Sequence, residues 1–164
     1  MTRFACLLVV AILSACTNSP ETRQSDKRIE GLEKAVADAK PGLGEMMGVI
    51  REHHAKLFYS GKAQNWELAQ YQIDELKEGF EDVSKFYPHF KEVKLALNEL
   101  IPKIVSPTLE DVAAAIKKKD KKAFHSAFGA LTESCNRCHQ AAEHGFIVIQ
   151  EPKSVEFTNQ KFTP

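Results

Sequence analysis

Apolar residues recur at three- and four-residue spacings along most of this chain, which restricts it to a helical fold. From residue 29 onward there are few runs of β-branched residues, and no Asn-Gly or Asp-Gly pair of the kind that closes a β-hairpin. Prolines and glycines divide the pattern into segments of helical length. The sequence therefore predicts an all-α protein, with a four-helix bundle and an extended C-terminal tail.

Caps and helix breakers set the expected boundaries. Asn65 is a good N-cap residue, Pro88 ends the helix before it, and Gly61 stands where a C-cap glycine is usual. A short helical lead-in from residue 29 ends at Pro41-Gly42. The four predicted helices span residues 43–60, 65–87, 90–119 (interrupted at Pro102 and Pro107) and 120–142. The segment 146–164 contains Pro152 and spaced Phe residues, and we expect it to lie over the bundle as a strap.

The N-terminus has the pattern of an export signal. Arg3 precedes an apolar run, Phe4 to Ala15, that is too short to span a bilayer as a helix. The run ends in Leu13-Ser14-Ala15-Cys16, which resembles the lipobox of bacterial lipoproteins, whose cysteine is lipidated. An ordinary secretory peptide is the alternative. We expect a signal peptide over 1–15, a lipid anchor at Cys16, a flexible tether over 16–28 and the folded domain over 29–164.

Charge and cysteine content exclude several classes of protein. With 22 basic and 22 acidic residues the chain has no excess positive charge for displacing the counterions of a nucleic acid. Of four cysteines, Cys6 leaves with the signal and Cys16 is acylated, so too few remain for a disulfide scaffold. No Ser-His-Asp arrangement, phosphate loop or carboxylate pair is evident. We therefore expect neither a nucleic-acid partner nor an enzyme.

The two remaining cysteines form the motif Cys135-Asn136-Arg137-Cys138-His139. On a helix, thiols three residues apart lie on one side and can each add to one vinyl group of a haem, while the adjacent imidazole ligates the iron. A zinc site is the first alternative, but consecutive ligands on a helix point in different directions. A redox dithiol is the second, but it belongs at a helix N-terminus. The motif predicts one covalent haem c, held by Cys135 and Cys138, with His139 as proximal ligand.

The sixth iron position decides whether such a haem transfers electrons or binds small molecules. Only two methionines follow the signal peptide, Met46 and Met47, and both fall on the first predicted helix. Met47 shares a helical face with Ile50 and His54, so we expect it to be the distal ligand. Met46, His54, His53 or an open site are the alternatives.

This chain resembles a known class of haem protein. A haem motif near the end of a four-helix bundle is similar to the cytochrome c′ architecture, in which haem lies between the first and last helices. The segments HHAKLFYSGKAQNWELAQYQIDELKEGFEDV (53–83), HGFIVIQEP (144–152) and NQKF (159–162) resemble a group of small bacterial monohaem cytochromes over residues 32–164. The resemblance implies a methionine ligand at Met47, a haem-propionate partner at Lys56, and a chain that can pair as a homodimer.

Together these features predict a monohaem c-type cytochrome that transfers single electrons. We expect it on the periplasmic side of the cell envelope, tethered by lipid to a membrane (the outer membrane is the expected one) and exchanging electrons with redox partner proteins. A soluble periplasmic protein is the alternative location. The alternative function is a five-coordinate haem protein that binds or senses NO, CO or O2, or has weak peroxidase activity.

Overall fold

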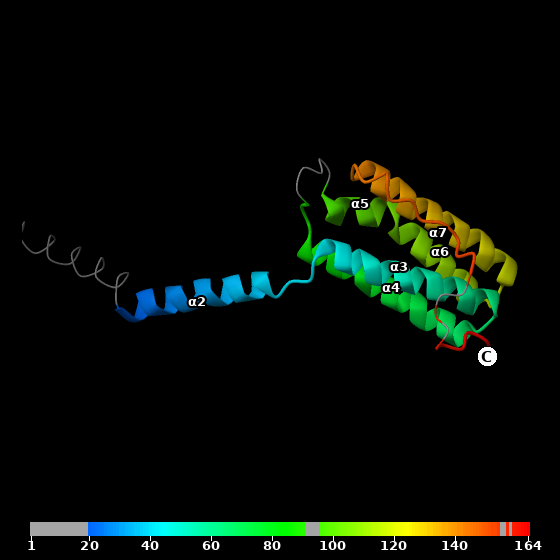
Figure 1. The fold of residues 1–164 in the computed structure, drawn as a ribbon, viewed down its shortest axis with the longest axis horizontal. Coiled ribbons are helices and arrows are strands. Elements are labelled where there is room, and N and C mark those ends of the chain that lie inside the picture. The colour runs from blue at the N-terminus through cyan, green and yellow to red at the C-terminus, as the bar shows by residue number, and fades with distance from the viewer. Residues whose placement is uncertain (1–19, 91–95, 155–156, 158) are drawn as a thin grey trace, which may run out of the picture. The chain divides into compact units, whose positions relative to one another are not determined.

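The computed structural model describes residues 20–90, 96–154, 157 and 159–164, and all regular secondary structure in them is helical (Figure 1). The prediction of an all-α chain is thus confirmed for this part. The chain divides into two units, residues 1–40 and 41–164. The predicted signal peptide, 1–15, and the predicted lipid anchor, Cys16, lie outside the described residues.

The first unit contains helix α2, Pro20–Asp38, none of whose residues is buried. We expected a flexible tether up to residue 28, but residues 20–28 are helical. Pro20 is suited to a first helical position, Glu21 lies in the first turn, and Arg, Gln and Lys residues favour helix without any apolar contact. The absence of large apolar residues was therefore a poor guide to structure here. Residues 29–40 of the predicted folded domain belong to the first unit, and the second unit starts at Pro41.

The second unit opens with an antiparallel pair of helices, α3 (Leu43–Lys62) and α4 (Trp66–Phe86). As predicted, Asn65 caps α4, and its side chain accepts a hydrogen bond from the Leu68 amide at 3.2 Å. The predicted C-cap role of Gly61 is wrong, because α3 continues through it. A Cβ at Gly61 would overlap the ring of Phe124 on α7, so this glycine allows two helices to approach closely.

Three further helices complete the unit: α5 (Leu97–Ile104), α6 (Ser106–Lys117) and α7 (Lys121–Ala141). The predicted third region is divided at Val105, between the two prolines that cannot donate a helical hydrogen bond. Asp120 caps α7 by accepting hydrogen bonds from the amides of Lys122 and Ala123, both at 3.0 Å. The Cys135–His139 motif lies in the last two turns of α7.

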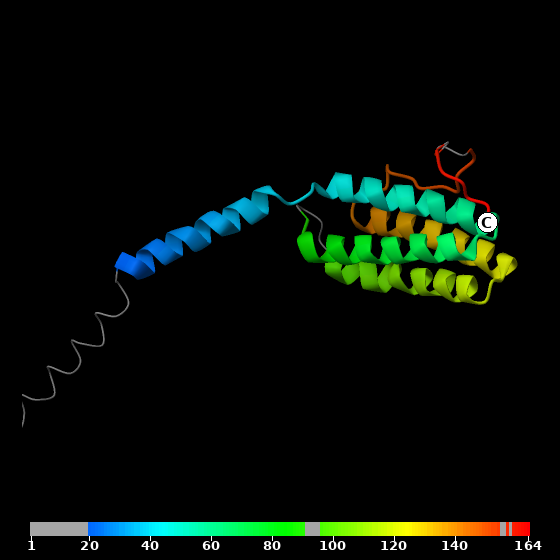
Figure 2. The same cartoon turned by 90° about the horizontal axis from the view of Figure 1, so that it is seen from below.

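The long helices of this unit lie alongside one another (Figure 2). Helix α3 packs on α4, α4 on α6, α6 on α7, and α7 on α3, while α5 contacts α4 and α7. The interior is apolar because each helix turns its periodic stripe inward. The most deeply buried apolar side chains are Leu57, Ala69, Ile73, Leu76, Val83, Val105, Val112, Phe128 and Leu131.

A tight turn ends α7 and directs the chain back over it. Glu143 adopts φ 61°, its amide donates to the Gln140 carbonyl at 3.1 Å, and the His144 amide donates to the His139 carbonyl at 2.7 Å. This is the Schellman arrangement, in which a left-handed residue satisfies the last carbonyls of a helix. The C-terminal strap, defined here as residues 146–164, then runs from α7 towards α3, where Tyr59 donates to the Ser154 carbonyl. We find no regular structure in its described residues.

Candidate functional site

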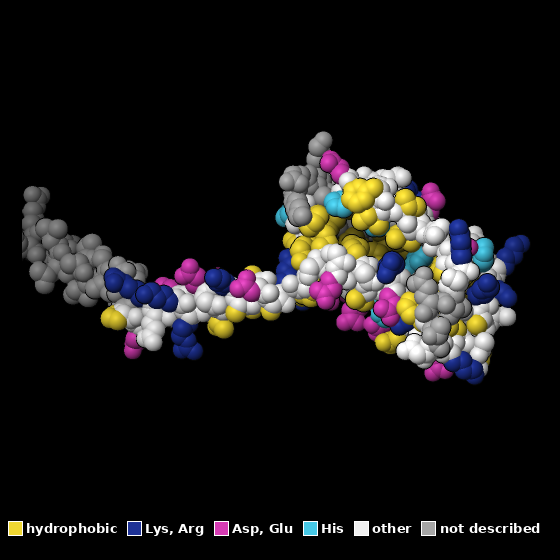
Figure 3. Space-filling view, in the orientation of Figure 1, with side chains coloured by type: hydrophobic (Ala, Val, Ile, Leu, Met, Phe, Trp, Pro, Cys, Tyr) yellow, Lys and Arg dark blue, Asp and Glu magenta, His cyan; other side chains and the backbone are white. Residues whose placement is uncertain are grey.

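A cavity of about 340 Å³ lies between α3 and α7. Figure 3 shows a hollow lined by hydrophobic side chains on this face of the second unit. The volume is within the range of small-molecule and cofactor pockets. Its apolar lining comes from four helices and the strap and includes Leu43, Met47, Ile50, Phe80, Phe90, Leu97, Ile101, Val105, Ala142, Ile147 and Ile149.

All three predicted proximal residues lie at the wall of this cavity. Cys135, Cys138 and His139 belong to the C-terminal end of α7, with Cys138 buried and Cys135 half-buried. The two thiols are free of any disulfide. Burial raises the pKa of the Cys135 thiol to about 12, and the neighbouring Cys138 adds to this effect. A redox dithiol needs a readily formed thiolate, so the site lacks the environment for that alternative.

The zinc alternative is not supported either. Among the described residues, no group of three or more His, Cys, Asp and Glu side chains is arranged to hold a metal ion. A zinc site would need four such ligands converging in tetrahedral geometry.

The imidazole of His139 is oriented by the strap. Its Nδ1 atom lies 2.8 Å from the carbonyl oxygen of Ile147. Because a carbonyl oxygen only accepts, Nδ1 must carry the proton, and Nε2 of the neutral ring keeps its lone pair. Metal-ligating histidines usually donate their second nitrogen to a carbonyl or carboxylate in this way. The His139 side chain is thus in the tautomer that an Nε2 iron ligand requires.

Met47 lies at the same cavity from the opposite helix, α3. Gly44 and Gly48 line the cavity beside it, and a Cβ at either glycine would meet no atom within 4 Å. This stretch of α3 therefore presents bare backbone and one thioether to the cavity. Met46 does not line the cavity, although it packs against the core.

His54 also lines the cavity, but its Nε2 atom is engaged elsewhere. Nε2 lies 2.9 Å from Thr132 Oγ1, and that hydroxyl donates its only hydrogen to the Phe128 carbonyl at 3.0 Å. Nε2 of His54 must therefore be the donor, which leaves it no lone pair for a metal. Nε2 of His54 is thus committed to Thr132 and not to the cavity.

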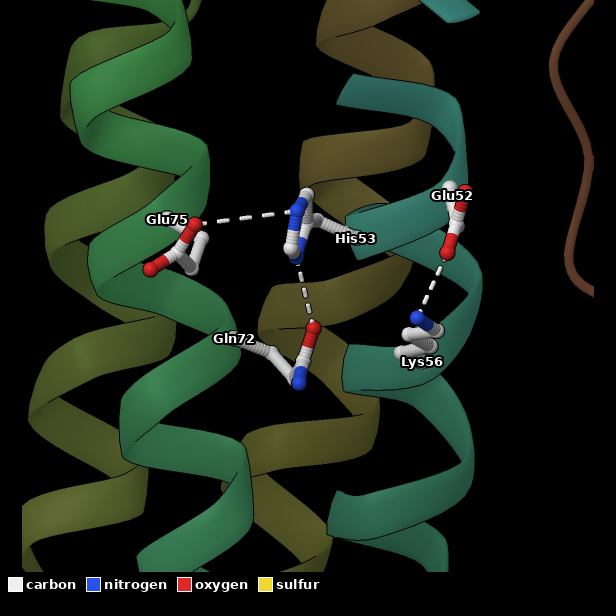
Figure 4. A network of polar contacts seen from close by, with 5 residues as sticks. All are labelled: Glu52, His53, Lys56, Gln72 and Glu75. Carbon is white, nitrogen blue, oxygen red and sulfur yellow. Dashed lines mark hydrogen bonds and ion pairs between the residues drawn. The ribbon is translucent and has the colours of Figure 1, made fainter. Parts of the chain in front are cut away.

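His53 faces α4 rather than the cavity (Figure 4). Its Nδ1 atom lies 2.8 Å from Gln72 Oε1, and its Nε2 atom lies 3.7 Å from Glu75 Oε2. The same figure shows Lys56 paired with Glu52 at 2.5 Å, and its Nζ atom also lies 5.0 Å from the centre of the Phe157 ring. Neither His53 nor Lys56 lines the cavity.

Two polar residues at the cavity were missed by the sequence reasoning. The exposed Arg51, one turn after Met47, lines the cavity and is better placed than Lys56 to meet an anionic group there. His144 also lines the cavity. The centre of its ring lies 5.9 Å from the ring centre of Phe90 and 5.5 Å from that of Phe146. The helical spacing from Met47 to Arg51 was the available signal for Arg51.

Asn136, inside the Cys135–His139 motif, was also missed. Its Nδ2 atom donates to the Ile149 carbonyl at 2.9 Å, and its Oδ1 atom accepts from the Ile149 amide at 2.7 Å. The side chain thus pairs with both main-chain groups of one strap residue, two positions beyond the carbonyl that holds His139.

Comparisons with protein-family models, with curated proteins and with solved structures give no match for this chain. Within residues 20–90 and 96–154, none of the helices has the length and apolar character needed to cross a bilayer.

Proposed function

We propose that this protein is a monohaem c-type cytochrome that transfers single electrons. One observation carries the proposal: Cys135, Cys138 and His139 on α7 and Met47 on α3 line the same apolar cavity. These are the residue types that anchor a haem by two thioethers and ligate its iron on both faces.

The residues around the cavity fit such a group. Apolar side chains line it, the His139 ring has the required tautomer, and Gly44 and Gly48 leave room along α3. The bound haem would supply an iron that changes between the ferric and ferrous states. The protein would supply two thioether anchors, an oriented imidazole, the thioether of Met47, and a Phe- and Leu-lined wall that excludes water. Arg51 would offset the negative charge of a propionate.

The finer fold is part of this proposal. Contacts among α3, α4, α6 and α7 support a four-helix bundle of the cytochrome c′ type, with α5 leading into α6. The expected position of haem in that architecture, between the first and last bundle helices, corresponds to the cavity between α3 and α7.

Location and partners rest on the sequence alone. We propose a lipoprotein with its anchor at Cys16, on the periplasmic side of the cell envelope, that exchanges electrons with redox partner proteins. The same proposal includes pairing into a homodimer and anchoring in the outer membrane.

The visible spectrum of the purified protein tests this function. We expect six-coordinate, low-spin ferric and ferrous forms, with little CO binding after reduction. The Met47→Ala variant should lose the methionine–iron charge-transfer band and bind CO, while Met46→Ala, the matched control one residue away, should keep the wild-type spectrum. A high-spin wild-type protein that binds CO readily would instead support the five-coordinate gas-binding or peroxidase alternative.

A further inference from the structure

We propose that Asn136 is a positioning residue for the proximal ligand: its carboxamide fastens the strap to α7 and so holds the Ile147 carbonyl against Nδ1 of His139. The inference rests on the proposed function, because His139 is the iron ligand only if haem binds. The contacts that carry it lie wholly within the protein.

The two hydrogen bonds of Asn136 fix one strap residue in both position and rotation. They reach the amide and the carbonyl of Ile149 at 2.7 and 2.9 Å. Ile147 and Ile149 are two residues apart, and both line the cavity, as alternate residues of an extended segment do. Holding Ile149 therefore also determines where the main chain at Ile147 lies.

Exposed side chains contribute little to holding this part of the strap. Phe146 and Val148 are 79% and 71% exposed, so their burial contributes little to the attachment. The turn at Glu143 returns the chain towards α7, and the Ile147 amide donates to the His144 carbonyl at 2.9 Å. Neither contact reaches Ile149, which the two hydrogen bonds of Asn136 join to α7.

The consequence for the ligand follows from histidine chemistry. The bond from Nδ1 to the Ile147 carbonyl sets the tautomer and the ring orientation, and such outer contacts also raise the basicity of the ligating nitrogen. Without the two Asn136–Ile149 hydrogen bonds, the Ile147 carbonyl can move away from His139. The imidazole of the haem-free chain is then free to rotate and to exchange tautomers. Asn136 would thus act on the iron site through the strap.

The test uses the mature chain as wild type, Asn136→Ala and Asn136→Asp. Arg137→Ala is the matched control, because Arg137 lies in the same motif, is exposed, and its side chain makes no hydrogen bond with the described residues. The Asp variant keeps an acceptor for the Ile149 amide but cannot donate to its carbonyl. Two readouts are used: hydrogen exchange of the Ile149 amide, with or without haem, and the imidazole ¹⁵N resonances of His139 in the haem-free chain, at a pH where the ring is neutral.

Asn136→Ala should exchange the Ile149 amide about tenfold faster or more, as expected for two lost hydrogen bonds. Its His139 resonances should move from the Nδ1–H tautomer towards a mixture, with Asp intermediate and Arg137→Ala unchanged. Unchanged exchange and tautomer in Asn136→Ala, or an equal effect in Arg137→Ala, would overturn the inference. A protein without haem would overturn the proposed function instead. Both readouts would still test whether Asn136 holds the strap and orients His139.

Discussion

Nε2 of His54 on α3 lies 2.9 Å from Oγ1 of Thr132 on α7, which joins the two helices that flank the cavity by a buried hydrogen bond. The His54 ring also packs on Phe128, with the ring centres 4.5 Å apart. Burial lowers the pKa of His54 from 6.5 to about 4. The folded protein therefore keeps this imidazole neutral at pH values where the unfolded chain protonates it.

The sign of the pH dependence follows from this difference. Between pH 6.5 and pH 4 the unfolded state binds a proton that the folded state does not, so the free energy of unfolding falls as the pH falls. For His54 alone the loss between pH 7 and pH 5 is about 2 kcal/mol. Urea denaturation of wild type and His54→Gln, followed by circular dichroism, should show a stability difference that shrinks by this amount. A difference that stays constant with pH would contradict the buried neutral histidine.

The close approach at Gly61 gives a second prediction. Phe124, whose ring a Cβ at this position would overlap, is itself buried against Trp66 and Phe128, at ring-centre distances of 6.0 Å each, so it has little room to move. We expect Gly61→Ala to lower the free energy of unfolding by about 2 to 3 kcal/mol through overpacking.

Gly129→Ala is the matched control for Gly61→Ala. Gly129 lies within α7, where an added Cβ would meet no atom within 4 Å. Alanine there should raise the free energy of unfolding by about 1 kcal/mol, because it forms helix more readily than glycine. If both variants were equally stable, the helices could not be as close at Gly61 as described.

The turn after α7 gives a third prediction. Glu143 has φ 61°, a conformation that costs a side-chain-bearing residue about 1 kcal/mol relative to glycine. Glu143→Gly should therefore raise the denaturation midpoint, with a gain of about 1 kcal/mol. Glu133 is an exposed position inside α7, and Glu133→Gly should lower the free energy of unfolding by about 1 kcal/mol. A loss of stability in both variants would argue against the left-handed turn.

The sequence was informative where periodicity or a local cap decides the structure. Asn65 caps its helix as predicted, and the helix expected from residue 120 begins at Lys121. Helical spacing also placed Met47, Ile50 and His54 on one face, and all three line the cavity. The sequence was misleading for residues 20–28, which are helical although they make no buried apolar contacts.

Contacts between distant segments could not be read from spacing. Asn136 contacts Ile149 only because the turn at Glu143 reverses the chain, and no periodic pattern in the sequence predicts this contact. Gly61 looks like a helix cap in the sequence, and only the position of Phe124 on α7 shows why it must lack a side chain. Likewise, whether Lys56 or Arg51 can meet an anionic group in the cavity depends on which face of α3 lines it, and only Arg51 does.

The mass of the purified mature protein tests the central claim most directly. After expression together with the c-type cytochrome maturation machinery, the chain should carry the mass of one haem that denaturation does not remove. The Cys135→Ser/Cys138→Ser double variant should lack this mass. A wild-type chain without it, in which two thiols react with an alkylating reagent after unfolding, would contradict the account.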